Sequence, residues 1–469
     1  PPRIIYCLPF TSIIDQTHQI FADVLKNAGF VGQDALLKHH HLTEAFYRTS
    51  EGDEYDADGA GQLLTESWQS EIIITTFYQL LNTFLSPANR NLKRTAQVAG
   101  AIVLLDEVQA VPLEYWDAIR ALFKTVAERT GARFILLTAT QPLIFEPDES
   151  VELLPYHRKY FEELSRTRLL CKHHRPITEE ELAEQVLAAL TSSAGESALI
   201  VVNRRATVRR LYEMLEKHFS HVLALSTYLT PYDRKARISK IRERLAKRKP
   251  CIVVSTQLIE AGVDLSFPIV FRDLAPLDCV IQTAGRCNRH GEGEVGDVYL
   301  VCLEGKRGRQ WQKIYDAPLV EATADVLGEK EVYLEHEFLE LAQRYFRACK
   351  NRQQQNRVDE LLTQGNFNEL PRKFQLIPEG LPTRSFFVIQ NTKDEELWAK
   401  YIDLEAQPPI DRERNFRTFK ADFYERVIQV YGTNEEGVCP LPFGPGTYDP
   451  DLGFVGLPAG EHEQGTIIL

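Results

Sequence analysis

Two adjacent carboxylates, Asp106 and Glu107, directly follow the apolar run Ala-Ile-Val-Leu-Leu at residues 101–105. A short, wholly apolar run of this kind predicts a strand that is buried on both faces inside a parallel sheet. The carboxylates then lie at the carboxyl end of the strand, where open α/β sheets place their ligand crevice. There, one carboxylate can hold Mg²⁺ while the other orients the water that attacks a γ-phosphate. A core strand whose exposed end is acidic by chance is the alternative.

Two arginines, Arg286 and Arg289, form the second candidate group, within the run Gln-Thr-Ala-Gly-Arg-Cys-Asn-Arg at 282–289. A helix is predicted from about Leu277 to Arg289, and residues three apart on a helix share a face. Two guanidiniums on one face match the charge of a transferring γ-phosphoryl group, so we expect them across a cleft from the two carboxylates, as arginine fingers. Two ordinary surface arginines are the alternative.

The elements that must position these groups alternate between strands and helices at the spacing of βαβ units, which build parallel sheets. The rhythm stops beyond about residue 310, where a helix is predicted over 331–349 within a smaller third region. The predicted fold class is therefore α/β, with two parallel-sheet lobes and a mixed C-terminal region. Residues 89–94 are predicted to be a polar connector. The predicted strands are 3–8, 71–74, 101–105 and 133–137, and then 198–202, 222–225, 251–254, 269–272 and 295–302.

Composition narrows the class of protein. The 469 residues carry a net charge of −12, which argues against a protein that coats nucleic acid with a wholly basic surface. The charge does not exclude local phosphate contacts, because screening confines surface fields to roughly 10 Å, so any nucleic-acid site must be a lined groove. The eight cysteines form no CxxC pair, no signal peptide is evident, and no apolar run reaches membrane-spanning length. These features predict a cytoplasmic protein without a membrane partner.

The motifs together carry a resemblance to a known family. They occur in the order of superfamily 2 helicase motifs, and their details resemble the helicase of type I CRISPR–Cas systems, a nuclease-helicase recruited by a surveillance complex. The resemblance covers roughly residues 3–302 and is weaker in the tail. It implies a first RecA-like lobe at 1–165, a second at 170–305 and a linker and accessory region at 310–469. The motifs lie at residues 8–11, 75–76, 106–109, 138–140, 256–264 and 282–289.

The resemblance also implies roles for single residues. Asp106 would hold Mg²⁺, Glu107 would polarise the attacking water, and Gln109 would link the γ-phosphate to the bound strand. Arg286 and Arg289 would meet the γ-phosphate from the second lobe. The residues implied for ATP binding or for coupling of the lobes are Thr138, Thr140, Gly262, Asp264 and Gln282. Those implied for nucleic-acid contact are Pro9, Thr11, Thr76, Asn203 and Thr256. The implied cofactors are ATP and Mg²⁺, and the implied partners are single-stranded DNA and the CRISPR surveillance complex.

Two departures from the family pattern limit what this chain is expected to do alone. The sequence contains no GxxxxGK[ST] phosphate-binding loop, which in this family precedes the strand at 3–8, and no His-Asp pair of the family's nuclease. The chain therefore resembles the distal part of a larger or split enzyme, inactive without the segment that carries the phosphate-binding loop and the nuclease. Another superfamily 2 helicase, acting on DNA or RNA, and a catalytically inert nucleic-acid-binding fragment are the alternatives.

Overall fold

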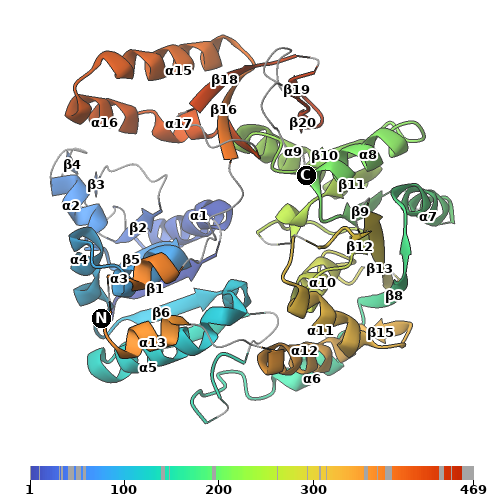
Figure 1. The fold of residues 1–469 in the computed structure, drawn as a ribbon, viewed down its shortest axis with the longest axis horizontal. Coiled ribbons are helices and arrows are strands. Elements are labelled where there is room, and N and C mark those ends of the chain that lie inside the picture. Colours follow the sequence, from blue (N-terminus) through green and yellow to red (C-terminus); the bar gives the residue numbers. More distant parts are fainter. Residues whose placement is uncertain are drawn as a thin grey trace. The chain divides into compact units, whose positions relative to one another are not determined.

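The computed structural model divides into two compact units, each built from three stretches of the chain (Figure 1). Unit 1 comprises Pro1–Val151, Gln353–Gly380 and Ala399–Asp422, and unit 2 comprises Glu152–Arg352, Leu381–Trp398 and Phe423–Leu469. The residues that the structure describes are 2–9, 11–30, 32, 35–40, 47–48, 54–55, 60–138, 143–146, 148–192, 197–260, 262–292, 294–305, 308–312, 314–352, 357–366, 368–374, 383–431, 438–444 and 446–456.

The described part of unit 1 is built on a five-stranded, wholly parallel sheet in the order β2-β5-β1-β6-β7. Because all five strands are parallel, their carboxyl ends meet at one edge of the sheet. The register places Leu8 opposite Thr76 and Asp106 opposite Leu137, so the predicted motif residues of this unit gather along that edge. The strands are β1 (Ile4–Leu8), β2 (Leu36–His39), β5 (Ile72–Thr76), β6 (Ile102–Asp106) and β7 (Arg133–Leu137).

The helices of unit 1 include one where a connector was expected, at residues 89–94. The helix α4 begins there, and a polar side chain of its first turns forms hydrogen bonds in the interior of the unit. Arg94 is only 3% exposed, and its guanidinium donates to the Glu66 carbonyl at 2.8 Å and to the Gln79 side chain at 2.7 Å. The main elements are α1 (Thr11–Asn27), α2 (Ala60–Glu66), α3 (Phe77–Leu85), α4 (Asn89–Val98) and α5 (Trp116–Thr130), with a small hairpin of β3 (Tyr47–Arg48) and β4 (Glu54–Tyr55).

Residues from the last third of the chain complete unit 1. The helix α13 (Arg357–Thr363) packs on α5, and α14 (Leu370–Lys373) packs on α3. The ring of Tyr115, in the short turn before α5, lies 4.5 Å from the ring of Phe374. The Tyr115 hydroxyl also donates to the Lys373 carbonyl at 3.4 Å. The segment 357–374 therefore covers the helix that follows the acidic motif. The unit also contains α16 (Pro409–Arg417).

Unit 2 is built on a larger sheet whose main path is β10-β11-β9-β12-β13-β8-β15, parallel except for β15. The central strands β11 and β12 are buried at every residue, and β9 is buried except at Ser197, as their apolar runs predict. The strands are β8 (Thr167–Ile177), β9 (Ser197–Val201), β10 (Val222–Leu225), β11 (Cys251–Ser255), β12 (Ile269–Asp273), β13 (Gly296–Gly305), β14 (Gly308–Arg309) and β15 (Val332–Leu334). The helices around them are α6 (His157–Glu162), α7 (Glu179–Ser192), α8 (Arg205–Leu215), α9 (Pro231–Ala246), α10 (Leu277–Ala284), α11 (Ala317–Leu327) and α12 (Phe338–Arg352).

Two helix predictions in unit 2 were wrong in extent. The helix predicted to reach Arg289 ends at Ala284, because the next residues pair with a distant segment. Phe267 donates its N–H to the Arg286 carbonyl at 2.9 Å and accepts from the Asn288 N–H at 2.8 Å. Arg286 and Arg289 therefore do not share a helix face. The helix predicted over 331–349 begins only at Phe338, because 332–334 form β15 against β8.

The C-terminal part of unit 2 holds a small mixed sheet. β16 (Thr383–Ile389) pairs antiparallel with β17 (Val427–Tyr431) and parallel with β18 (Val438–Pro442). Unit 2 also contains the short strands β19 (Tyr448–Asp449) and β20 (Gly453–Phe454). The boundary between the units falls within α15 (Thr392–Asp403), after Trp398, and within α17 (Lys420–Tyr424), after Asp422. Two parallel-sheet lobes followed by a mixed region confirm the predicted α/β class. Among the described residues, no helix is both long enough and apolar enough to cross a membrane.

Candidate functional site

Asp106 ends β6 and is held there by a tyrosine from the neighbouring strand. The Tyr6 hydroxyl, on β1, donates to Oδ2 of Asp106 at 2.8 Å. Two effects raise the pKa of Tyr6: burial is the larger, and the hydrogen bond to Asp106 is the next. The phenol therefore stays protonated and remains a hydrogen-bond donor. Sequence reasoning did not identify Tyr6. It lies in a predicted strand, but only the pairing of β1 with β6 brings it to the carboxylate.

Glu107 has an unusual backbone and is fixed through its side chain. Its φ of 56° and ψ of 43° lie in the left-handed region, which for a non-glycine residue costs about 1–3 kcal/mol and is enriched at functional sites. The Gln109 amide donates to the Glu107 carboxylate at 2.5 Å, and the Thr138 hydroxyl donates to the Gln109 carbonyl oxygen at 2.5 Å. A row of hydrogen bonds therefore joins the ends of β6 and β7, and it brings together Glu107, Gln109 and Thr138.

The two carboxylates offer hard oxygen donors at the sheet edge, and both residues are half-buried. Among the described residues, no group of three or more His, Cys, Asp or Glu side chains could hold a metal ion. Mg²⁺ does not need such a group, because it is typically bound through one or two carboxylates together with water and substrate phosphates. Asp106 therefore fits the metal role that the sequence predicts.

The remaining predicted residues of unit 1 lie at the same edge of the sheet, with one exception. Pro9 directly follows β1, and Thr11 begins α1. Thr76 ends β5 and caps α3, where its hydroxyl accepts the Gln79 N–H at 3.2 Å. Thr140 lies outside the described residues, as does the alanine before it.

In unit 2, the two predicted arginines are tied to the loop that follows β11. Arg286 is 7% exposed and donates to the carbonyl of Ile259 at 3.0 Å and to that of Glu260 at 2.6 Å. Arg289 is more exposed, and its Nε lies 2.6 Å from Oδ1 of Asp264. The loop and the arginine segment therefore form one bonded group, although the helix expected to join the arginines ends before them.

The other predicted residues of unit 2 surround this group. Thr256 is buried at the end of β11, and Gln282 is half-buried on α10. Gly262 has a φ of 73°, a left-handed conformation that glycine adopts without strain. Asn203 follows β9, but its amide points inward and donates to Oδ2 of Asp273 at 2.7 Å and to the Leu274 carbonyl at 2.8 Å.

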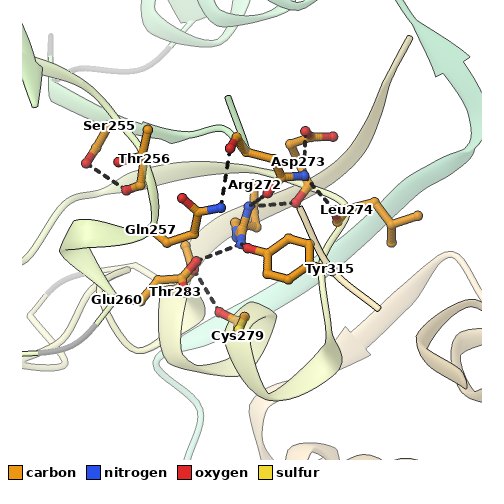
Figure 2. A network of polar contacts seen from close by, with 11 residues as sticks. Ser255, Thr256, Gln257, Glu260, Arg272, Asp273, Leu274, Cys279, Thr283 and Tyr315 are labelled. Atoms are coloured by element: carbon orange, nitrogen blue, oxygen red, sulfur yellow. Dashed lines mark hydrogen bonds and ion pairs between the residues drawn. The ribbon is translucent and has the colours of Figure 1, made fainter. Parts of the chain in front are cut away.

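A buried polar network that sequence reasoning missed lies behind the loop (Figure 2). Arg272, on β12, is fully buried and lies 2.7 Å from Oε1 of Glu260. It also donates to the Tyr315 hydroxyl at 2.9 Å and to Oδ1 of Asn203 at 2.8 Å. Burial raises the pKa of Asp273 to about 7, against the opposing effects of the Leu303 N–H and Arg272. The one available signal was an arginine inside the apolar strand at 269–272.

The structure thus joins some of the predicted residues by direct contacts within each unit: Glu107, Gln109 and Thr138 in unit 1, and Asp264 and Arg289 in unit 2. The group in unit 1 has two acidic side chains aligned by neutral donors, and the group in unit 2 has two guanidiniums set on a loop. Carboxylates that bind a cation and orient water, together with guanidiniums that bind phosphate oxygens, are the groups used in phosphoryl transfer.

Comparison with known proteins finds consistent similarities. Residues 194–292 match the family model described as the C-terminal part of the CRISPR-associated nuclease/helicase Cas3. The chain is 29% identical to the CRISPR-associated nuclease/helicase Cas3 of Haloferax volcanii, over 62% of this chain and 41% of that protein. It is 24% identical to the protein of the same name from Methanothermobacter thermautotrophicus, over 69% of this chain and 40% of that protein. The chain thus spans about two fifths of the length of these relatives.

Solved structures show the same fold over almost the whole chain. A crystal structure of T. fusca Cas3-ATP superposes with a TM-score of 0.69 and 16% identity, and covers 97% of this chain and 65% of that chain. A chain of a CRISPR RNA-guided surveillance complex, pre-nicking, gives a TM-score of 0.58 at 16% identity, over 97% of this chain and 68% of that chain. At such identities, the likeness shows the fold and leaves the chemistry to be argued from the residues.

Proposed function

Because this chain is a protein of the Cas3 helicase type, we propose that it forms the ATP-hydrolysing motor core of a helicase. The motor would move along single-stranded DNA in type I CRISPR interference and unwind target DNA for a nuclease domain. The observation that carries the proposal is the hydrogen-bonded row from Glu107 through Gln109 to Thr138, beside Asp106. The relatives named nuclease/helicase support the activity, and the T. fusca Cas3-ATP structure supports ATP as the nucleotide.

The residues of unit 1 would activate water. Glu107 would accept a hydrogen bond from the attacking water, while Gln109 holds its carboxylate in place. Asp106 would hold Mg²⁺, which when bound supplies positive charge next to the phosphate oxygens. Thr138 fixes Gln109 from the neighbouring strand end, so movement of that strand would reach Glu107. We keep Thr140 in the proposal as a coupling residue.

The residues of unit 2 would bind the charge that develops on the γ-phosphate. Arg286 and Arg289 are the proposed phosphate-binding side chains, with Gly262, Asp264 and Gln282 around them. A guanidinium fixed by backbone carbonyls is preorganised, so little side-chain entropy remains to be lost when an anion binds.

The proposal extends to nucleic acid and to partner proteins. Five residues are the proposed contacts with DNA: Pro9, Thr11, Thr76, Asn203 and Thr256. Each is the last residue of a strand of a parallel sheet or lies within three residues after the end of one. The proposed partners are single-stranded DNA, the CRISPR surveillance complex, and a segment that carries the phosphate-binding loop and the nuclease. We also propose a cytoplasmic location and a division into a first lobe at 1–165, a second at 170–305 and an accessory region at 310–469.

ATP hydrolysis tests the function directly. Turnover would be measured with and without single-stranded DNA, with single-stranded RNA as the competing activator, and with and without a segment that supplies GxxxxGK[ST]. We expect DNA to stimulate turnover when that segment is present, and the Arg286→Ala variant to keep only a small, measurable fraction of that turnover. Absence of turnover under every condition would exclude the motor, and equal stimulation by RNA would favour another superfamily 2 helicase.

Replacing Tyr6 by phenylalanine tests the support of Asp106. The variant removes the hydroxyl that donates to Asp106 while the ring stays in the core. Loss of a partner behind a metal ligand typically weakens metal binding by about 10–100-fold, so we expect the Mg²⁺ concentration for half-maximal ATP turnover to rise by about that factor. The matched control is Tyr299→Phe, which removes a hydroxyl that donates to Asp297 in unit 2. An unchanged Mg²⁺ requirement in the Tyr6 variant would contradict the assignment.

A further inference from the structure

The buried network behind the loop of unit 2 contains an ion pair that the proposed chemistry does not use. Arg272 and Glu260 are 0% and 7% exposed in their side chains, and their charged atoms lie 2.7 Å apart. Around them, the Arg272 guanidinium donates to the backbone carbonyl of Asp273 and to the Tyr315 hydroxyl (Figure 2). It also donates to Oδ1 of Asn203. Arg272 is thus held by bonds to residues at or just after the ends of β9 and β12, and to Tyr315.

Such a pair is costly to bury. Taking two charges out of water costs free energy that their attraction regains only with very good geometry, and well-packed apolar residues of similar volume are often as stable or more stable. Stability of the core alone is therefore a weak explanation for an arginine in the apolar strand β12. A role in fixing one arrangement of the neighbouring loop explains it better.

Glu260 links this pair to Arg286. Its side chain binds Arg272, while its backbone carbonyl accepts a hydrogen bond from Arg286 at 2.6 Å. The neighbouring carbonyl, of Ile259, accepts the second bond from Arg286 at 3.0 Å. The Thr283 hydroxyl, one turn before Arg286, also lies 3.4 Å from Oε1 of Glu260. The position of the Arg286 guanidinium therefore depends on where Glu260 is held.

We propose that Arg272 and Glu260 are positioning residues, whose buried ion pair locks the loop that sets the Arg286 guanidinium for the γ-phosphate. The expected effect on turnover rests on the proposed ATP hydrolysis. The expected effect on the loop rests only on the bonds that join Arg272, Glu260 and Arg286. It predicts that the pair acts on turnover through Arg286 and leaves nucleotide affinity largely unchanged.

The test replaces both charges together, as Glu260→Leu with Arg272→Met, so that neither partner of the ion pair is left without the other. In the ATP-hydrolysing protein we expect kcat to fall by about 100-fold, the effect of a misplacement of about 1 Å, with KM for ATP within about twofold. In an Arg286→Ala background, the same double replacement should cause no further loss, because residues that act as a unit are not additive. A loss that multiplies with that of Arg286→Ala would overturn the proposal.

A control pair separates positioning from general loss of packing. Arg426 and Asp394 form another buried ion pair of unit 2, 2.9 Å apart and 5% and 3% exposed. Their replacement, as Arg426→Met with Asp394→Leu, should leave kcat unchanged. An equal fall in kcat in the control would show that any buried pair of the unit has this effect, and would overturn the proposal.

Amide hydrogen exchange on this chain gives a readout that needs no activity. The Glu260 and Arg272 double variant should exchange about tenfold faster at residues 257–260 and 262–264, with β9 and β11 unchanged, because only the loop loses its anchor. Unchanged exchange in the loop would overturn the positioning role. If the unsubstituted protein fails to hydrolyse ATP, the proposed function fails, and the exchange measurement still decides whether the pair anchors the loop.

Discussion

Replacing Glu107 by glutamine is expected to lower ATP turnover by about 1,000-fold, within the range of about 10²–10⁴ that a positioned general base contributes. The amide has the size of the carboxylate but cannot take a proton from water. The Gln109 amide and the Thr138 hydroxyl remain in place around it. The measurement is kcat at saturating ATP and DNA, together with the equilibrium affinity for a non-hydrolysable nucleotide, which should change by less than about twofold because binding does not require the base.

The control for this variant is Glu114→Gln, a change of the same chemistry at an exposed acid in the turn before α5. It should leave turnover at the level of the unsubstituted protein. If Glu107→Gln keeps more than about a tenth of the original kcat, the water is oriented by another group, since loss of a general base has a larger cost. The comparison is informative because both variants remove one negative charge from the same part of unit 1.

Arg426→Met is expected to destabilise the C-terminal part of unit 2 by about 3–5 kcal/mol, the usual cost of leaving one partner of a buried ion pair uncompensated. Asp394 is 3% exposed, so water cannot replace the lost guanidinium. The variant also loses the contact of Arg426 with the ring of Tyr232, whose centroid lies 4.8 Å away. Urea unfolding would measure the loss. Trp398, whose ring lies 5.4 Å from that of Phe387 on β16, provides a local fluorescence signal.

The double variant Arg426→Met with Asp394→Leu is the informative partner of this experiment. Removal of both charges should recover most of the stability, because the penalty arises from the charge left behind. A single variant that loses less than about 1 kcal/mol would show that the carboxyl group is satisfied in another way, and would contradict the argument from burial.

The sequence predicted most strands of both parallel sheets, because a buried strand needs a short apolar run wherever it lies. Asp106 could be placed at a strand end by this local signal alone. Tyr6 could not, because its role depends on which strand pairs with β6 and in which register. The end of α10 was missed for a similar reason, since residues after Ala284 leave the helix to pair with Phe267, well before them in the chain.

Buried polar side chains were the second source of error. Residues 89–94 were predicted to be a connector because charged residues such as Arg94 normally lie on the exposed surface. Arg94 is instead buried. Arg272 and Asn203 were likewise not recognised as partners, since their bonds join β9 and β12 with residues far along the chain. Bonds of this kind join residues that are far apart in the chain. Hydrophobic periodicity and residue propensity describe only neighbouring residues, so they cannot predict such bonds.

The division of each unit into separate stretches of chain has a consequence for synthesis on the ribosome. The first stretch of unit 1 ends at Val151, but its last stretch ends at Asp422, which is made long afterwards. At about 5–20 residues per second, the wait is roughly 15–55 s. Until residue 374 has been made, the face of α5 that later receives α13, and the ring of Tyr115 that later meets Phe374, lack the cover that these later residues provide. Unit 1 therefore keeps this surface exposed during synthesis, and a gene cut at residue 305 would leave both units without stretches that belong to them.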